Sequence, residues 1–339
     1  MLRGRDPELA RLSTMVDAVV SGRSGVAVVE GMAGIGKTAL LAEVARLGLG
    51  AGCVVAAGRA DELDQISPMG GLLGALRSGQ PPVLTHGDLE GLQATDQRLW
   101  LLDRLYQILE VEAGRHPLII IVDDMQWADN ATLLAIGSLP VRLFSVPILW
   151  GLARRTSPAS PSLETALQRL REAGATTFSL GPIDDAAVAT VVEDLVGSPP
   201  DRLLAAELRR AAGNPFYVGQ LIQQLVVTSG LEVRDGQAQI NSTKPSLDLA
   251  ATITFHVGSL SDPARRVLEI GSVLGREFLL TTVAELLNQP AGQLVAAVAE
   301  CQRAQLLSDD GDFLVFNHDL VREAVYQQVP RSVRAAPAP

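Results

Sequence analysis

Gly25-Val-Ala-Val-Val-Glu-Gly-Met-Ala-Gly-Ile-Gly-Lys-Thr38 is the stretch of sequence on which the fold depends. Its apolar residues at 26–29 predict a short buried strand, and the apolar periodicity of 39–45 predicts a helix directly after Thr38. The glycines between them allow backbone N–H groups to bend inward around an anion. The stretch therefore predicts a strand, an anion-holding turn and a helix.

The turn matches the phosphate-binding pattern G-x-x-x-x-G-K-S/T, known as the P-loop. A helix that begins near Lys37 adds its positive N-terminal end to the site. We expect Lys37 to reach the β- and γ-phosphates of ATP, where it is also a candidate catalytic group, and the Thr38 hydroxyl to hold Mg²⁺. The alternative is a strand, a turn and a helix with chance glycines, which the flanking elements disfavour. The predicted ATP or ADP contacts here are Gly31, Gly34, Ile35, Gly36, Lys37, Thr38 and Ala39.

Composition limits the class of protein. The chain has 339 residues, which predicts two or three domains, and 47% hydrophobic with 19% charged residues favours packed cores over disorder. No apolar run approaches about 18 residues and no signal peptide precedes Asp6, so we expect a cytoplasmic protein without a membrane span. Cys53 and Cys301 lack metal-ligand spacing and are expected to be reduced core residues. The net charge of −10 argues against nucleic-acid binding by the chain alone.

A second motif is Leu118-Ile-Ile-Ile-Val-Asp-Asp124, an apolar run that ends in two carboxylates. Branched residues without alternation predict a strand buried on both faces, as in a parallel sheet. In a P-loop protein this is the form of the Walker B element, in which Asp123 binds Mg²⁺ directly or through water and Asp124 polarises the attacking water. The alternative is a strand that stops at a polar turn, which the upstream P-loop disfavours.

Strands that alternate with helices predict a three-layer α/β fold of the P-loop NTPase type, with a parallel sheet of five core strands. Arg154 and Arg155 follow the fourth strand, where an arginine can face a γ-phosphate and act in catalysis. The alternative for each arginine is a solvent-facing position. After Gly181, helical periodicity indicates a helical lid, and Asp235-Gly236 predicts a β-hairpin.

The last part of the chain predicts helices followed by two strands that flank Asp309-Asp-Gly-Asp312, which together resemble a winged helix. Its acidic hairpin tip would repel phosphates, so we expect this winged-helix-like domain to pack against protein and not DNA. The predicted domains are residues 1–181 for the P-loop ATPase core, 182–243 for the helical lid with its hairpin, 244–330 for the winged-helix-like domain and 331–339 for a disordered tail.

With these motifs in order, the chain resembles the STAND class of AAA+-like P-loop ATPases, and more closely the N-terminal ATPase region of large LuxR-type (LAL) transcriptional regulators. The resemblance covers nearly the whole chain, and its two most specific strings are Asp-Asp-Met-Gln-Trp-Ala-Asp at 123–129 and His-Asp-Leu-Val-Arg-Glu-Ala-Val-Tyr at 318–326. The other strings that carry it are Leu2-Arg-Gly-Arg-Asp-Pro-Glu-Leu9, the P-loop, Gly58-Arg-Ala-Asp-Glu-Leu63 and Gly213-Asn-Pro-Phe-Tyr217.

The resemblance implies roles for individual residues. The segment around Arg5 would line the adenine side of the site, and Arg154 or Arg155 would be the sensor arginine. Pro215 in the lid would pack near the base or ribose. His318 would touch the ADP β-phosphate and lock the inactive state, although Asn317 replaces the methionine of the related Met-His-Asp motif. The alternative for His318 is an ordinary residue at the start of a helix.

The family continues into a helical-repeat sensor region and a C-terminal helix-turn-helix, whereas this sequence stops at Pro339. We therefore expect a truncated regulator, an excised fragment or a stand-alone module. The leading expectation is a slowly hydrolysing ATP/ADP·Mg²⁺ switch that self-associates or binds another protein through its winged-helix region, without direct nucleic-acid or membrane binding. The alternatives are a P-loop enzyme such as a small-molecule kinase, and a non-hydrolysing nucleotide-dependent scaffold.

Overall fold

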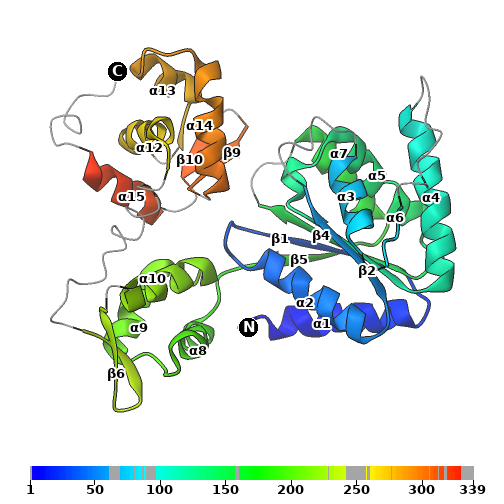
Figure 1. Cartoon of the computed structure of the whole chain (residues 1–339), viewed down its shortest axis with the longest axis horizontal. Coiled ribbons are helices and arrows are strands. Elements are labelled where there is room, and N and C mark those ends of the chain that lie inside the picture. The colour runs from blue at the N-terminus through cyan, green and yellow to red at the C-terminus, as the bar shows by residue number, and fades with distance from the viewer. Residues whose placement is uncertain are drawn as a thin grey trace.

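The structure is a computed structural model with a sheet flanked by helices, a lid of helices and a C-terminal group of helices with a small sheet (Figure 1). The last predicted helix, the hairpin of the lid and the five core strands are all present. His318 and the predicted tail at 331–339 lie outside the described residues. The described residues are 2–60, 69–79, 81–85, 88, 97–156, 160–227, 229–241, 257, 260–275, 277–304, 306–311, 313–316 and 319–329.

The central sheet confirms the predicted five parallel strands. Its order is β2-β3-β4-β1-β5 and every pairing is parallel. All of β3 is buried, as its unbroken apolar run requires. Because the strands are parallel, the turn after β1 and the carboxylates after β3 lie at the same edge of the sheet. The strands are β1 (Gly25–Gly31), β2 (Val54–Arg59), β3 (Leu118–Asp123), β4 (Ile148–Arg155) and β5 (Thr176–Leu180).

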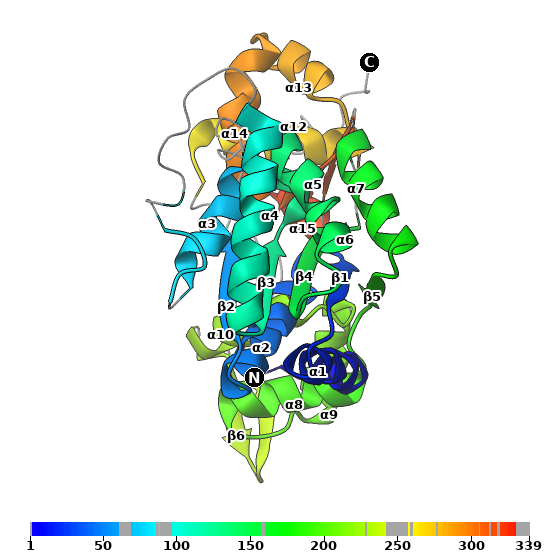
Figure 2. The ribbon, with the colours of Figure 1, turned by 90° about the vertical axis from the view of Figure 1, so that its right-hand side faces the viewer.

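Helices cover both faces of this sheet and complete the three layers (Figure 2). One face packs against α1 (Asp6–Val20) and α2 (Lys37–Gly50), through a core that includes Leu12, Leu40 and Ile119. The other face packs against α3 (Gly70–Ser78), α4 (Gln97–Arg115), α5 (Asn130–Ile136), α6 (Leu139–Arg142) and α7 (Pro161–Glu172). The sequence analysis did not predict α3, whose glycine-rich sequence has weak helix propensity, but Leu72 and Leu76 are buried by packing on the sheet.

The lid confirms the predicted helices and hairpin. Side-chain oxygens of Asp184 and Asp201 accept N-terminal N–H groups of α8 and α9. Asp235 and Gly236 both have positive φ angles, 51° and 74°, which a tight two-residue hairpin turn requires. The elements are α8 (Asp185–Val196), α9 (Arg202–Leu208), the 3₁₀ turn η4 (Arg209–Ala211), α10 (Pro215–Val227), β6 (Leu231–Arg234) and β7 (Gln237–Ile240).

The C-terminal group contains the predicted helices and hairpin strands, with one further short strand, β8. Strand β10 pairs antiparallel with both β8 and β9, and Ser261 caps the first helix. The sequence analysis missed β8 because two residues are too short for a period-2 pattern. The elements are α12 (Asp262–Leu274), β8 (Glu277–Phe278), α13 (Leu280–Leu286), α14 (Ala291–Arg303), β9 (Leu307–Asp310), β10 (Phe313–Phe316) and α15 (Asp319–Gln328).

The buried apolar residues form three clusters. Two lie on the faces of the five-stranded sheet, and the third joins the lid to the C-terminal helices without including any residue of the sheet. Cys53 and Cys301 are buried free thiols, and burial raises the pKa of both, to about 12 for Cys301. Among the described helices, none combines the length and the apolar character needed to cross a membrane.

Candidate nucleotide-binding site

The turn between β1 and α2 depends on glycine at several positions. Gly34 and Gly36 have φ angles of 74° and 105°, in the left-handed region that residues with a Cβ rarely adopt. Gly31 is needed for space, because a Cβ there would lie 2.8 Å from Ile35 Cγ2 and 2.9 Å from the carbonyl oxygen of Leu180. The chain leaves this turn directly into α2, whose first-turn residues Thr38 and Ala39 are exposed. The positive end of α2 is therefore open to an anion.

The side chain of Lys37 lies against the start of this turn. Its ammonium donates hydrogen bonds to the carbonyl oxygens of Gly31 and Met32, both at 2.9 Å. Its side chain is nearly buried, and this burial lowers the pKa of the amine to about 8 despite the opposing attraction of Asp124. A phosphate in the turn would supply the negative charge that favours the protonated amine.

Thr38 and Asp123, the two predicted magnesium ligands, are in contact with each other. The Thr38 hydroxyl donates to Asp123 Oδ2 at 2.5 Å, and Asp123 Oδ1 accepts the backbone N–H of Asp124 at 2.7 Å. Oxygen ligands are those that Mg²⁺ takes, and it usually binds through one or two protein groups with phosphates and water in the remaining positions. Within the described residues no cluster of three or more His, Cys, Asp or Glu side chains offers a metal site of its own. The pair therefore fits a cation that arrives with a polyphosphate.

Asp124 lies beside this pair and is held from two sides. Its backbone has a φ of 52°, which is unusual for a residue other than glycine, and it leads into the short 3₁₀ turn η3 (Met125–Trp127). Asp124 Oδ1 accepts a hydrogen bond from Gln126 Nε2 at 2.7 Å, while Oδ2 forms an ion pair with Arg59 at the end of β2. Both carboxylate oxygens of the predicted water-activating group are therefore engaged.

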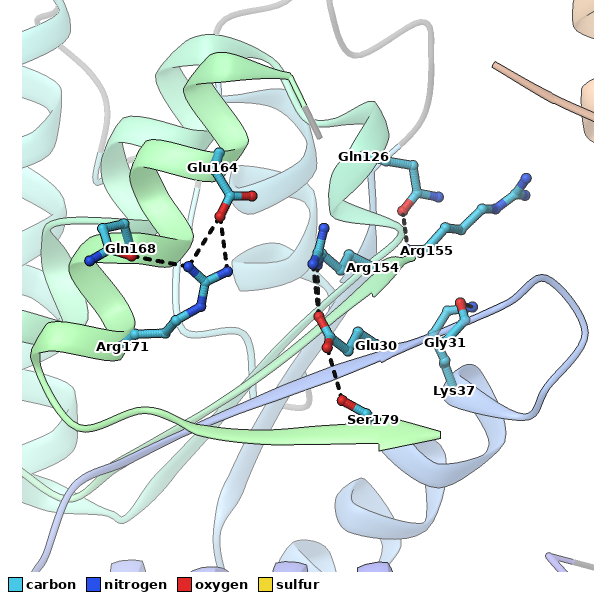
Figure 3. A network of polar contacts seen from close by, with 10 residues as sticks. All are labelled: Glu30, Gly31, Lys37, Gln126, Arg154, Arg155, Glu164, Gln168, Arg171 and Ser179. Atoms are coloured by element: carbon cyan, nitrogen blue, oxygen red, sulfur yellow. Dashed lines mark hydrogen bonds and ion pairs between the residues drawn. The ribbon is translucent and has the colours of Figure 1, made fainter. Parts of the chain in front are cut away.

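The two arginines at the end of β4 leave the strand in different directions (Figure 3). Arg155 is buried, and this burial lowers the pKa of its guanidinium, while the negative charge of Asp124 acts in the opposite direction. Arg154 instead donates two hydrogen bonds to Glu30 Oε2, at 2.8 and 3.1 Å, and Glu30 Oε1 accepts from Ser179 Oγ at 2.9 Å (Figure 3). Of the two arginines, Arg154 is therefore held by Glu30, whereas Arg155 lies within the electrostatic influence of the carboxylates beside the P-loop.

Glu30 is the residue just before the P-loop and faces both neighbouring strands. It is in register with Arg154 on β4 and with Ser179 on β5. Burial by itself raises the pKa of the Glu30 carboxyl, but the hydrogen bonds from Ser179 and Arg154 outweigh it, so that the net shift is downward. Glu30 is thus held as a carboxylate in contact with the strand that carries Arg154.

Arg5 is buried against the P-loop from the N-terminal side. Its guanidinium donates to the carbonyl oxygens of Ile35 at 3.1 Å and Gly181 at 2.5 Å, and its Nε is buried with no hydrogen-bond partner among the described residues. Burial lowers its pKa, with a partial offset from Glu8. The structure therefore links Arg5 to the backbone of the loop and to the start of the lid.

The lid touches the P-loop next to Pro215, the first residue of α10. Asn214 Nδ2 donates to the Ala33 carbonyl at 2.9 Å, and the Phe216 N–H donates to the Gly34 carbonyl at 3.3 Å. A Cβ on Gly34 would lie 2.8 Å from the Phe216 Cβ, so the two backbones approach closely. Pro215 therefore stands at a contact between lid and loop, as the ribbon of α10 beside the loop after β1 also indicates (Figure 1).

The site also contains Glu30, Arg59, Gln126 and Asn214, for which the sequence motifs predict no role. A charged residue within an apolar strand is a signal that was available for Glu30. Arg59 is paired in register with Asp123, but this follows only from β2 and β3 being neighbours in the sheet. The predicted residues that the structure does bring together at one edge are the P-loop, Asp123, Asp124, Arg155, Arg5 and Pro215.

Comparison with known proteins agrees with this geometry. The family model of the AAA ATPase domain matches residues 1–150. A Walker-type ATPase of Pyrococcus abyssi is 13% identical with a TM-score of 0.51, and the match covers 96% of each chain. A STAND protein with a tetratricopeptide repeat sensor from Pyrococcus horikoshii is 16% identical with a TM-score of 0.40, over 98% of this chain and 43% of that chain.

An uncharacterized protein of Rhizobium meliloti (strain 1021) is 24% identical over 380 residues, which include 98% of this chain. The chain spans 36% of the length of that relative. The five-stranded parallel sheet thus has the P-loop NTPase fold, and residues 1–150 are similar to an AAA ATPase domain.

Proposed function

We propose that the chain is a nucleotide-dependent switch that binds ATP with Mg²⁺ between sheet and lid and hydrolyses it slowly. The observation that carries the proposal is the meeting of Lys37, the Thr38–Asp123 pair and Asp124 at the P-loop. Three cations, Lys37, Arg59 and Arg155, surround two carboxylates in this group. A surplus of one positive charge in a partly buried site favours a polyphosphate ligand.

Each residue has a step in this proposal. The backbone N–H groups of the turn and of the start of α2 hold the phosphates, and Lys37 exchanges its two carbonyl partners for phosphate oxygens. Thr38 and Asp123 orient the magnesium ion, whose role when bound is to neutralise the charge of the transferred phosphoryl group. Asp124 orients and polarises the attacking water, and Arg155 stabilises negative charge beside it.

The resting arrangement is consistent with slow turnover. The carboxylate of Asp124 must accept a hydrogen bond from water, but Arg59 holds one of its oxygens in an ion pair. Each carboxylate oxygen has two lone pairs, so water can join without complete release, although the geometry must adjust. A switch requires such a long-lived bound state.

For the finer role, we propose a cytoplasmic signalling ATPase of the STAND class, related to LuxR-type regulators. The motif strings support it, as does the order α12, β8, α13, α14, β9, β10, which is that of a winged helix. The C-terminal group would then provide self-association or a protein partner. The role of His318 in holding ADP remains a prediction, as do the domain boundaries at 181 and 243.

The test measures nucleotide binding and phosphate release separately. We expect Lys37→Ala to lose ADP and ATP binding, and Asp124→Asn to keep binding but to lose hydrolysis by at least about 100-fold. Asp17→Asn, an exposed carboxylate on α1, is the matched control that should behave as the unmodified protein. Transfer of phosphate to a small-molecule acceptor would favour the kinase alternative. Binding without any hydrolysis would favour the scaffold, and absence of nucleotide binding would reject the proposal.

A further inference from the structure

We propose that Gln126 is a positioning residue that orients the Asp124 carboxylate and links it to the strand that carries Arg155. The inference rests on the proposed function and names a further residue for its hydrolytic step. It also identifies the physical path between the two groups, through one side-chain amide.

The amide of Gln126 uses both of its ends. Its Nε2 donates to Asp124 Oδ1 at 2.7 Å. Its Oε1 accepts the backbone N–H of Arg155 at 3.1 Å, the bond drawn in Figure 3. A carboxylate only accepts and a backbone N–H only donates, so a single orientation of the amide satisfies both neighbours. Gln126 thus connects η3, which follows β3, with the end of β4.

Asp124 needs such a restraint because it lies just beyond the regular strand. Its left-handed backbone turns the chain out of β3, and the sheet no longer fixes its side chain. Of its two partners, Arg59 has a side chain that is 62% exposed, so solvent and salt weaken that ion pair. Gln126 is half-buried and its hydrogen bond is less exposed to such screening.

The bond to Arg155 gives the restraint a second consequence. Because Gln126 holds the main chain of Arg155, a shift at the end of β4 is passed to the carboxylate of Asp124 through the same amide. Water activation and charge stabilisation would therefore be aligned together. Misplacement of a reacting group by about 1 Å can cost about 100-fold in rate, so loss of the amide is expected to slow hydrolysis by about 10- to 100-fold.

The experiment uses the full chain with three variants. Gln126→Met keeps the length of the side chain and removes both hydrogen bonds, and Gln126→Glu keeps the acceptor for Arg155 but repels Asp124. The matched control is Gln168→Met on α7. It removes a hydrogen bond of similar length, the 2.8 Å bond from the Gln168 amide to the Glu172 carboxylate, at an exposed site. Readouts are kcat and KM for ATP, the Kd for ADP and the thermal midpoint of unfolding.

We expect kcat to fall in Gln126→Met and at least as far in Gln126→Glu, with KM and Kd changed by less than about threefold and a thermal midpoint lowered by no more than about 4 °C. Gln168→Met should match the unmodified protein. An unaltered kcat in Gln126→Met overturns the inference. If Asp124→Asn still loses hydrolysis in the same assay, the proposed function stands without it. A parallel loss of kcat, nucleotide affinity and thermal stability also overturns it, because it indicates a structural role. If the unmodified protein binds no nucleotide or does not hydrolyse it, both proposals fail.

Discussion

At the level of single residues, Lys37 carries a charge that its surroundings disfavour without a ligand. Burial lowers its pKa to about 8, whereas phosphates would stabilise the ammonium. We therefore predict that ADP affinity falls as pH rises through about 8, because binding then requires proton uptake. Titrations with ADP at about pH 7 and about pH 9 measure the loss of affinity. Calorimetry in buffers of different ionisation enthalpy measures the number of protons taken up on binding. Lys37→Arg, which stays charged, is the control; an affinity that is constant over this range contradicts the prediction.

The same pKa has the opposite effect on the stability of the protein without nucleotide. The folded amine has a pKa of about 8 and the ordinary value is 10.5, so the unfolded chain binds more protons between these values. Stability from this group therefore rises with pH across that interval and is lowest below about pH 8. We predict that Lys37→Met stabilises the ligand-free protein near neutral pH, by up to about 3 kcal/mol for a shift of this size. Urea unfolding measures this gain in the free energy of unfolding. An equal gain at about pH 10.5 would argue against the lowered pKa of Lys37 as the cause of the stabilisation.

Arg154 and Arg155 are adjacent in sequence, but their substitution by alanine should have different effects. Arg155→Ala is expected to lower kcat with little change in stability, since burial disfavours the charge of this guanidinium and the attraction of Asp124 only partly offsets that cost. Arg154→Ala leaves Glu30 without its ion-pair partner and should cost about 2 kcal/mol of stability, the range for hydrogen bonds to charged groups. Steady-state hydrolysis and urea unfolding separate the two. The double variant Glu30→Gln with Arg154→Met should recover part of the stability, and a kcat defect confined to Arg154→Ala would refute the assignment.

At the level of elements, the sequence predicts what is contiguous and misses what the sheet order creates. Residue spacing and apolar runs predict the P-loop, the Asp123–Asp124 pair and the five strands, because each of these lies within one short stretch of sequence. Arg59 reaches Asp124 only because β2 lies next to β3, and Glu30 meets Arg154 only because β1 lies next to β4. No local pattern encodes those neighbours. The sequence therefore predicts correctly at which edge of the sheet the site lies, but it does not distinguish the roles of Arg154 and Arg155.

The contact between α10 and the P-loop predicts a role for Asn214 in nucleotide affinity. Asn214→Ala removes the hydrogen bond to the Ala33 carbonyl, which is worth about 1 kcal/mol, and leaves the longer one from the Phe216 N–H to the Gly34 carbonyl. We expect ADP affinity to fall by about fivefold, because a loosened lid must be ordered again on binding. Titration with ADP measures the change. Asn130→Ala, an exposed position at the start of α5, is the control, and equal affinities for the two variants would contradict the prediction.

At the level of the whole molecule, few hydrogen bonds between described residues join the sheet-bearing part to the lid. The buried cluster of the lid and C-terminal helices contains no residue of the sheet. The bonds that cross are largely polar: Arg3 with Asp194 at 2.8 Å, Arg5 with the Gly181 carbonyl, and Asn214 with the P-loop. Exposed ion pairs of the Arg3–Asp194 type add little stability. The two parts are therefore expected to be weakly coupled until a ligand contacts both.

The position of the tryptophans allows this coupling to be measured. Trp100, Trp127 and Trp150 all lie in the sheet-bearing part of the chain, whereas circular dichroism in the far ultraviolet reports every helix. Without nucleotide, we predict that urea unfolding followed by fluorescence and by circular dichroism gives transitions that do not coincide. With ADP at about 100 times its Kd, binding adds about 2.7 kcal/mol to the folded state, and because the ligand contacts both parts the transitions should merge. Lys37→Ala should show separate transitions with or without ADP; coincident transitions in the ligand-free protein would show that sheet and lid already unfold as one unit.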